Sequence, residues 1–366
     1  MRVLLLGGTG TLSSAVLKRA LENGWNISVF NRGNNNKNIP SDVEIIKGDF
    51  KQIANCDKFR NATYDVVIDF LSRIPEDIDR SYPIFKNICK QYIFISSACV
   101  YRRAPSDFPI KETSPMPNPN WKYNVQKYEC EKKLGSLSTD ATSYYTIVRP
   151  YITYDDNRIP LGIAPAYKYH KTIIERIRSG KPMFVWDNGE AVSTITYTDD
   201  FARGLVGLFM NDKAKNQAFH IVSDYQYTGK QILLELYSAL DKTPNIISVS
   251  SDKICKLMPK YSDMIKGDRA LDAKFDNSKI KDAVPGLTFE IDIKEGLKRI
   301  VSHYDSMADA EYDYEFDAQM DRAAKKCGVK TKYIPYPSLQ KPQRLRYLIF
   351  KLFPYKLAKK IGRFCK

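Results

Sequence analysis

Residues 2–23 read RVLLLGGTGTLSSAVLKRALEN, and they give the strongest indication of the fold. An apolar run typical of a buried strand comes first, and apolar residues at helical spacing end it. Gly7 and Gly10 lie between the two parts, where only glycine permits both a tight turn and the close approach of a phosphate to the backbone. The order of strand, glycine turn and helix predicts a dinucleotide-binding domain, with the pyrophosphate at the amides of Thr11 and Leu12. A glycine turn that holds no ligand is the alternative.

Short apolar runs alternate with helical patterns through the first 150 residues. Each run has four to six residues, a length that suits a strand buried on both faces. The alternation predicts an α/β fold of the Rossmann type, with a doubly wound parallel sheet and a smaller C-terminal lobe. Strands are expected at Arg2–Leu6, Trp25–Phe30, Val43–Ile46, Asp65–Phe70, Tyr92–Ser96 and Tyr145–Val148, and helices at Leu12–Asn23, Tyr82–Lys90 and Trp121–Leu134.

The pattern loosens after Pro150, where Tyr, Pro and Asn become frequent. We expect residues 1–150 to form the dinucleotide-binding domain, with a sheet that later segments complete. Residues 151–305 would form a substrate lobe, 306–340 an acidic-to-basic linker and 341–366 a basic amphipathic tail.

The net charge of +15 is concentrated at the end of the chain. Residues 322–366 hold fourteen of the 57 Lys and Arg residues and no Asp or Glu, which leaves 43 basic and 42 acidic residues before them. The body is therefore nearly neutral, and only the tail is a candidate for contact with a polyanion or a membrane.

Seven scattered cysteines and three histidines form no cluster with metal-ligand spacing. This pattern excludes a zinc site of the usual kind and indicates a reducing compartment. No apolar run approaches the roughly 18–20 residues that a spanning helix needs. We therefore expect a cytoplasmic protein without a metal.

The second expected strand ends in Asn31 and Arg32, where a carboxylate that binds the adenosine ribose is usual. Without that carboxylate a 2′-phosphate is not repelled, and Arg32 can pair with it. This favours NADP over NAD, unless Arg32 is simply solvated in a loop. Asp49 and Phe50 close the third strand, where Asp49 would meet the adenine edge.

Tyr123 and Lys127 stand four residues apart in an expected helix, so they share one face. A phenol with a pKa of about 10 is a poor base at neutral pH, but a nearby ammonium favours the phenolate. Ser97 follows the fifth strand, at the edge where ligands bind in such sheets. We predict that Tyr123 moves a proton beside a nicotinamide, that Lys127 also holds the nicotinamide ribose, and that Ser97 binds the substrate oxygen.

The set of motifs resembles the extended short-chain dehydrogenase/reductases, the NAD-dependent epimerase/dehydratase family, over roughly residues 1–305. The resemblance implies Ser97, Tyr123 and Lys127 as the catalytic trio of an enzyme that transfers hydride to and from a nucleotide-linked sugar. The motifs are Gly7-Gly8-Thr9-Gly10, Gly48-Asp49, Ser96-Ser97-Ala98-Cys99-Val100-Tyr101, Tyr123–Lys127, Arg149-Pro150 and Thr198-Asp199-Asp200-Phe201-Ala202.

Two features, Phe-Asn-Arg-Gly at 30–33 and Asp-Phe after Gly48, resemble an atypical branch of this family more than its typical members. That branch includes the chloroplast stem-loop-binding proteins. Family members that act on nucleotide sugars commonly carry an Arg after a Gly-Asp-Gly turn, but none follows Gly189 here. Arg158, Arg176 and Arg178 are the candidate substitutes. An NADPH-dependent reductase of another carbonyl substrate, and an RNA- or dinucleotide-binding protein without catalysis, remain alternatives.

The tail has an apolar stripe at helical spacing within a basic segment. Such a segment is typical of helices that lie on an anionic membrane, which would suit an enzyme of surface-polysaccharide assembly on the inner face of a membrane. Packing on the protein's own body, or on a second subunit of a homodimer, is the alternative, and nucleic acid is the least favoured partner. The stripe consists of Leu345, Leu348, Ile349, Leu352 and Phe353, and resumes at Leu357, Ile361 and Phe364.

Overall fold

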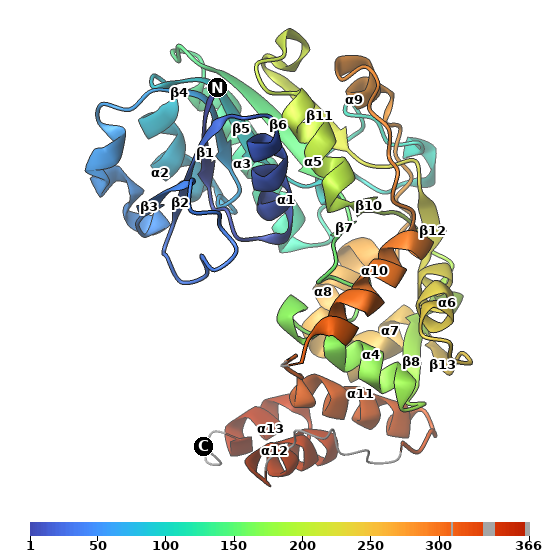
Figure 1. Ribbon diagram of the computed structural model, residues 1–366. Coiled ribbons are helices and arrows are strands. Elements are labelled where there is room, and N and C mark those ends of the chain that lie inside the picture. The colour runs from blue at the N-terminus through green and yellow to red at the C-terminus, as the bar shows by residue number, and fades with distance from the viewer. Residues whose placement is uncertain (309, 332–340, 363–366) are drawn as a thin grey trace. The chain divides into compact units, whose positions relative to one another are not determined.

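The computed structural model describes residues 1–308, 310–331 and 341–362, which divide into two compact units (Figure 1). The first unit consists of residues 1–154, 194–226 and 273–292. The second consists of residues 155–193, 227–272 and the remainder of the chain from 293. Three stretches from the range 151–305 therefore belong to the first unit: 151–154, 194–226 and 273–292.

A parallel sheet of seven strands forms the centre of the first unit. Its order is β11-β6-β5-β4-β1-β2-β3, so the direction of strand addition reverses between β1 and β4. The apolar runs form these strands because both faces of the sheet are covered. The strands are β1 Arg2–Leu6, β2 Asn26–Asn31, β3 Glu44–Lys47, β4 Tyr64–Asp69, β5 Cys89–Ile95, β6 Tyr144–Pro150 and β11 Gln217–Ile221.

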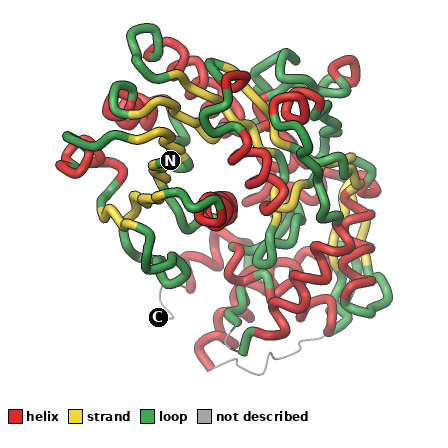
Figure 2. The backbone as a smooth tube through the Cα atoms, turned by 45° about the horizontal axis from the view of Figure 1, so that its top comes forward, coloured by secondary structure: helices red, strands yellow, loops and turns green. Residues whose placement is uncertain are grey.

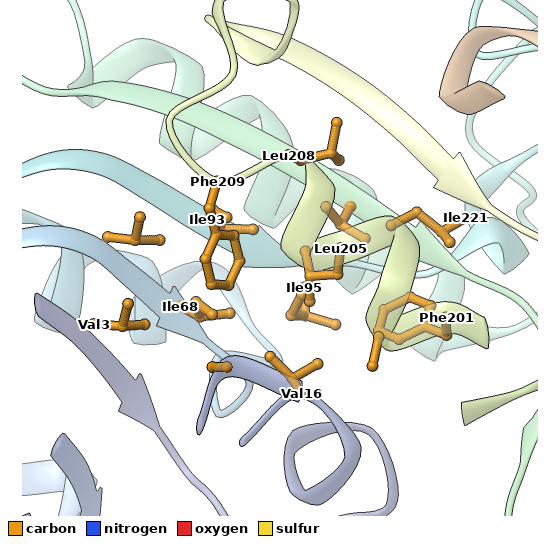
Figure 3. Close-up of a cluster of buried hydrophobic side chains, with 14 of the residues drawn as sticks. Val3, Val16, Ile68, Ile93, Ile95, Phe201, Leu205, Leu208, Phe209 and Ile221 are labelled. Carbon is orange, nitrogen blue, oxygen red and sulfur yellow. The ribbon is translucent and has the colours of Figure 1, made fainter. Parts of the chain in front are cut away.

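Two pairs of helices cover the sheet. Helices α1 (Thr11–Glu22) and α5 (Thr198–Gly207) pack on one face, and α2 (Pro75–Phe85) and α3 (Lys122–Leu137) on the other. Figure 3 shows the first of these cores, where side chains of α1 and α5 meet those of the strands. Its members include Val3, Val16, Ile68, Ile93, Ile95, Phe201, Leu205, Leu208, Phe209 and Ile221.

One helix differs from its expected position. A helix was expected at Tyr82–Lys90, whereas α2 spans Pro75–Phe85 and β5 already begins at Cys89. The first turn of α2 contains Glu76 and Asp77, and these polar residues weaken the apolar periodicity there. The remaining elements of the first unit are β7 Thr153–Tyr154, its partner β10 Thr196–Tyr197, and α9 Ser278–Ala283.

Helices make up most of the second unit (Figure 2). It contains one parallel pair of strands, β8 Met183–Trp186 and β13 Ile246–Val249. Two further strands, β9 Val192–Thr194 and β12 Gln226–Thr228, pair with each other. The helices are α4 Lys171–Arg178, α6 Gly229–Ala239, α7 Ser251–Leu257, α8 Ser262–Met264, α10 Ile293–Ser306, α11 Tyr314–Lys326, α12 Lys341–Leu352 and α13 Tyr355–Gly362.

Helix α11 lies within the range 306–340, for which the sequence suggested a linker. Among the described residues, no helix combines the length and apolar character needed to cross a bilayer.

Candidate active site at the carboxyl edge of the sheet

The glycine turn after β1 has the shape that a bound pyrophosphate requires. Gly7 has a φ of +84°, and a Cβ atom at Gly8 would lie 2.5 Å from Cγ1 of Val29 on β2. Gly10 is the N-cap of α1, and the first-turn amides, including those of Thr11 and Leu12, have no acceptor within the helix. The first turn of α1 has no acidic side chain. The turn therefore fits an anionic dinucleotide.

The end of β2 is an ordered loop. The Asn31 carbonyl Oδ1 accepts from the Gly33 amide at 2.7 Å, and its Nδ2 donates to Oδ1 of Asn36 at 2.8 Å. Arg32 is exposed next to it. Asn31 thus shapes the loop through its own side chain, and Arg32 is open to solvent at the position where a 2′-phosphate would be read.

Asp49 and Phe50 follow β3. Oδ1 of Asp49 accepts from the Lys51 amide at 3.0 Å and caps the short helix Phe50–Asn55. The Phe50 side chain packs, partly buried, against the core beneath α2 and α3. The Asp49 carboxylate therefore already has a structural role as a cap.

Lys127 is buried at the carboxyl ends of β4 and β5. Its Nζ donates to the carbonyl oxygen of Ser72 at 2.7 Å and to that of Ile95 at 2.8 Å, and lies 4.8 Å from the ring centroid of Phe94. Burial lowers the pKa of Lys127 to about 8. At neutral pH the lysine is thus mostly charged, and it holds that charge at the edge of the sheet.

Asp69 is a residue of the site that the sequence analysis missed. It ends β4 with its side chain fully buried, and its Oδ1 accepts from the amides of Leu71 and Ser72 at 2.8 and 2.9 Å. Its Oδ2 accepts from the hydroxyls of Ser72, Ser81 and Tyr92 at 2.5, 3.1 and 2.7 Å. Asp69 thereby fixes Ser72, whose carbonyl receives Lys127. The sequence did contain a signal for this residue, because an acidic side chain ends the apolar run that forms β4.

Ser97 follows β5 and is buried. Its Oγ accepts from the Cys99 amide at 3.2 Å and caps the turn that follows. The Ile95 carbonyl that binds Lys127 is two residues earlier, so Ser97 and Lys127 lie at the same strand end. The neighbouring Ser96 Oγ is buried without a hydrogen-bond partner among the described residues.

Tyr123 lies in the first turn of α3, one turn before Lys127 and on the same face. Its ring is partly buried and packs on Trp121 with the centroids 4.8 Å apart. The predicted trio therefore comes from two adjoining elements, the end of β5 and the start of α3.

A buried ion pair holds α3 against β6. Arg149 Nε and Nη2 donate to the two carboxylate oxygens of Glu131 on α3 at 2.9 and 2.7 Å. Arg149 Nη1 also donates to the Tyr101 hydroxyl at 2.6 Å. Arg149 thus connects Tyr101, at the end of the serine motif, to the helix that carries Tyr123 and Lys127.

The candidate substitutes for the missing diphosphate-binding Arg lie in the second unit. Arg176 is fully buried, and its Nη1 lies 2.7 Å from carboxylate oxygens of both Asp317 and Asp321. We therefore exclude Arg176 as a ligand of a substrate diphosphate. Arg178 forms ion pairs with Asp305 and Glu175. The guanidinium of Arg158 lies 4.6 Å from the ring centroid of Tyr167. Among the described residues, no group of His, Cys, Asp and Glu could hold a metal ion.

Fold and site together define a dinucleotide-binding α/β protein of the Rossmann type. The model of the NAD dependent epimerase/dehydratase family matches residues 3–222, and the chain belongs to this family. Chloroplast stem-loop binding protein of 41 kDa b from Arabidopsis thaliana is 26% identical over 243 residues. The match covers 62% of this chain and 60% of that protein's length.

Three solved structures share the fold. UDP-glucuronic acid 4-epimerase from Bacillus cereus, in complex with UDP-glucuronic acid and NAD, is 17% identical, with a TM-score of 0.66 over 83% of this chain and 99% of that chain. An epimerase from Methanothermobacter thermautotrophicus is 16% identical, with a TM-score of 0.68 over 83% of this chain and 92% of that chain. UDP-glucose 4-epimerase from Thermus thermophilus, in complex with NAD, is 16% identical, with a TM-score of 0.63 over 84% of this chain and 100% of that chain.

Proposed function

We propose that this protein is an NAD(P)-dependent oxidoreductase of the epimerase/dehydratase type that acts on a nucleotide-linked sugar. The observation that carries the proposal is the buried ammonium of Lys127 at the carboxyl edge of the sheet, one helical turn from Tyr123. A protein that only binds ligands has little use for a buried cation one helical turn from a phenol, because burying the charge costs free energy.

Each residue of the trio has a distinct role. Tyr123 moves the proton to and from the substrate oxygen, and the positive charge of Lys127 favours its phenolate. The hydroxyl of Ser97 donates a hydrogen bond to the same substrate oxygen, while its Oγ accepts from Cys99. The ion pair of Arg149 with Glu131 and the Asp69–Ser72 contact keep α3 and Lys127 in place for this chemistry.

The cofactor is a nicotinamide dinucleotide, held at Gly7, Gly10, Thr11 and Leu12 and, at its adenosine end, by Asn31, Arg32, Asp49 and Phe50. Its nicotinamide would accept a hydride from the sugar carbon and return it. The solved relatives from B. cereus and T. thermophilus hold NAD. The exposed Arg32 favours NADP in this chain.

The family and the UDP-glucuronic acid bound to the B. cereus enzyme support a nucleotide sugar as substrate. The test incubates the purified protein with a panel of UDP-, GDP- and dTDP-sugars, each with NAD or NADPH, and follows the products by mass spectrometry. A changed sugar with unchanged total cofactor indicates an epimerase or dehydratase, and stoichiometric oxidation of NADPH indicates a reductase. Failure to bind either nucleotide in a titration would overturn the proposal.

A second candidate is a protein that binds RNA without catalysis, and the name of the Arabidopsis relative, a stem-loop binding protein, favours the binding part of it. The same preparation would then retain a stem-loop RNA in a filter-binding assay. It would also show no conversion of any sugar in the panel.

A further inference from the structure

Residues 341–362 form a folded part of the second unit. Helices α12 and α13 pack on α11 through a small apolar cluster (Figure 1). Tyr347 and Phe350 are each 1% exposed and Ile349 is 7% exposed. The cluster consists of Ala318, Tyr347, Ile349, Phe350 and Ala358.

Polar contacts also attach α12 to α11. The Tyr347 hydroxyl donates to the buried carboxylate of Asp321, and Arg346 Nε lies 2.5 Å from the Glu315 carboxylate. Arg322 Nη1 donates to the Leu352 carbonyl at 2.6 Å. One face of α12 therefore packs against α11 and is not available to a partner.

A second apolar face of α12 points to solvent. Leu345, Leu348 and Leu352 are 50%, 46% and 61% exposed. At 3.6 residues per turn they fall within about 60° of arc, on the side of the helix away from Tyr347 and Phe350. The apolar stripe expected from the sequence is thus divided: Ile349 packs inward, while the three leucines face outward. Phe364 lies outside the described residues.

Phe353 and Leu357, 39% and 44% exposed, follow the three leucines along the chain. These five residues, here called the tail surface, lie within thirteen positions. The other large hydrophobic residues that are exposed in the described part of the chain are scattered from Met1 to Met307. Single exposed apolar residues are ordinary, but three exposed leucines on one side of a helix mark an interaction surface.

Exposed cations flank the tail surface, while the acidic Glu315 of α11 pairs with Arg346. Arg344, Lys356 and Lys360 are exposed and form no ion pair within the described part of the chain. Beyond Asp321 the sequence contains no Asp or Glu at all. The surface therefore combines exposed leucines with unneutralised cations.

We propose that the tail surface docks the protein on an anionic lipid bilayer, with α12 lying in the plane of the interface. A bilayer takes up the leucines among its acyl chains and offers anionic headgroups to Arg344, Lys356 and Lys360. Helix α12 has 12 residues, about 18 Å in length, and so cannot span the hydrocarbon core.

Two other occupants fit the surface less well. A second copy of this chain would bring like charges together across a two-fold axis. RNA would neutralise the cations through its phosphates but would leave the leucines in water. This proposal is independent of the proposed enzymatic function, because it uses no residue of the candidate active site.

The test is co-sedimentation of the full-length protein with vesicles of phosphatidylcholine alone or of phosphatidylcholine with 30% phosphatidylglycerol. The test variant is L345S/L348S/L352S, and the matched control is I45S/L234S, which changes two exposed apolar residues elsewhere. We expect binding to the anionic vesicles only, weakened at least tenfold in the test variant and by added salt, and unchanged in the control. Circular dichroism of both variants establishes that they are folded.

Three outcomes would overturn the proposal. The first is equal sedimentation of wild type and the folded test variant. The second is a wild-type dimer that the test variant converts to a monomer while vesicle binding is absent in both. The third is binding to RNA, but not to vesicles, that survives the three substitutions. Turnover of a soluble substrate would be unaffected by the test variant, which separates a failure here from a failure of the enzymatic proposal.

Discussion

The ammonium nitrogen of Lys127 lies 2.7 Å from the carbonyl oxygen of Ser72, and Ser72 is itself fixed by Asp69. This relationship places a charged group of α3 against the ends of two strands. It also explains how a cation can be buried without a direct ion pair, because carbonyl dipoles and the nearby carboxylate stabilise it.

The first prediction concerns the pH dependence of stability. The pKa of Lys127 is about 8 in the folded protein and 10.5 in the reference state, so unfolding takes up a proton between these values. The contribution of Lys127 to stability therefore rises with pH, and the buried charge destabilises the fold most below pH 8. Between pH 7 and pH 10 the free energy of unfolding of wild type should gain about 2 kcal/mol relative to Lys127→Met.

Urea unfolding of both proteins at several pH values measures this difference. The comparison with the variant removes the contribution of other titrating groups. A difference that stays constant, or falls as the pH rises, would show that Lys127 is not a buried ammonium.

The second prediction concerns Asp69. Its carboxylate accepts five hydrogen bonds away from solvent, so Asp69→Asn leaves donors poorly matched and should lower the free energy of unfolding by about 3 kcal/mol. Asp65→Asn, on the same strand but in a surface ion pair with Lys90, is the control and should cost less than about 1 kcal/mol. Equal losses in chemical denaturation would remove the special role of Asp69.

The third prediction concerns Gly8. A Cβ there would lie 2.5 Å from Val29, so Gly8→Ala should destabilise the fold by about 1–3 kcal/mol through overpacking. Val29→Ala opens the space, so the double variant should recover part of that loss in a thermodynamic cycle. Strict additivity of the two substitutions would contradict the close contact between Gly8 and Val29.

The fourth prediction concerns the cofactor. If Arg32 pairs with a 2′-phosphate, Arg32→Ala should weaken NADPH binding about tenfold and leave NAD binding unchanged. Arg60→Ala, an exposed arginine that pairs with Asp57, is the control. Equal affinities of wild type and Arg32→Ala for NADPH would show that Arg32 does not contact the 2′-phosphate.

The strands could be predicted closely because a buried parallel strand is apolar on both faces, as in Val3–Leu6. Helix α11 was not predicted because acidic residues give way to basic ones within it, as they would in a charged linker. Phe316, Met320 and Ala324 nevertheless recur at helical spacing and are buried. The role of Asp69 depends on Ser81 and Tyr92, which only tertiary structure brings to it. Likewise, the sequence could not show that Ile349 faces inward.

Turnover by Tyr123→Phe tests directly whether Tyr123 transfers the proton. Tyr128→Phe changes a phenol five residues further along the same helix and is the matched control. With the substrate identified from the panel, kcat of Tyr123→Phe should fall by about 10²–10⁴-fold, because the proton transfer is lost. The Kd for the nicotinamide nucleotide should stay close to that of wild type and of Tyr128→Phe. Undiminished kcat in Tyr123→Phe would contradict the assignment of Tyr123 as the proton-transferring residue.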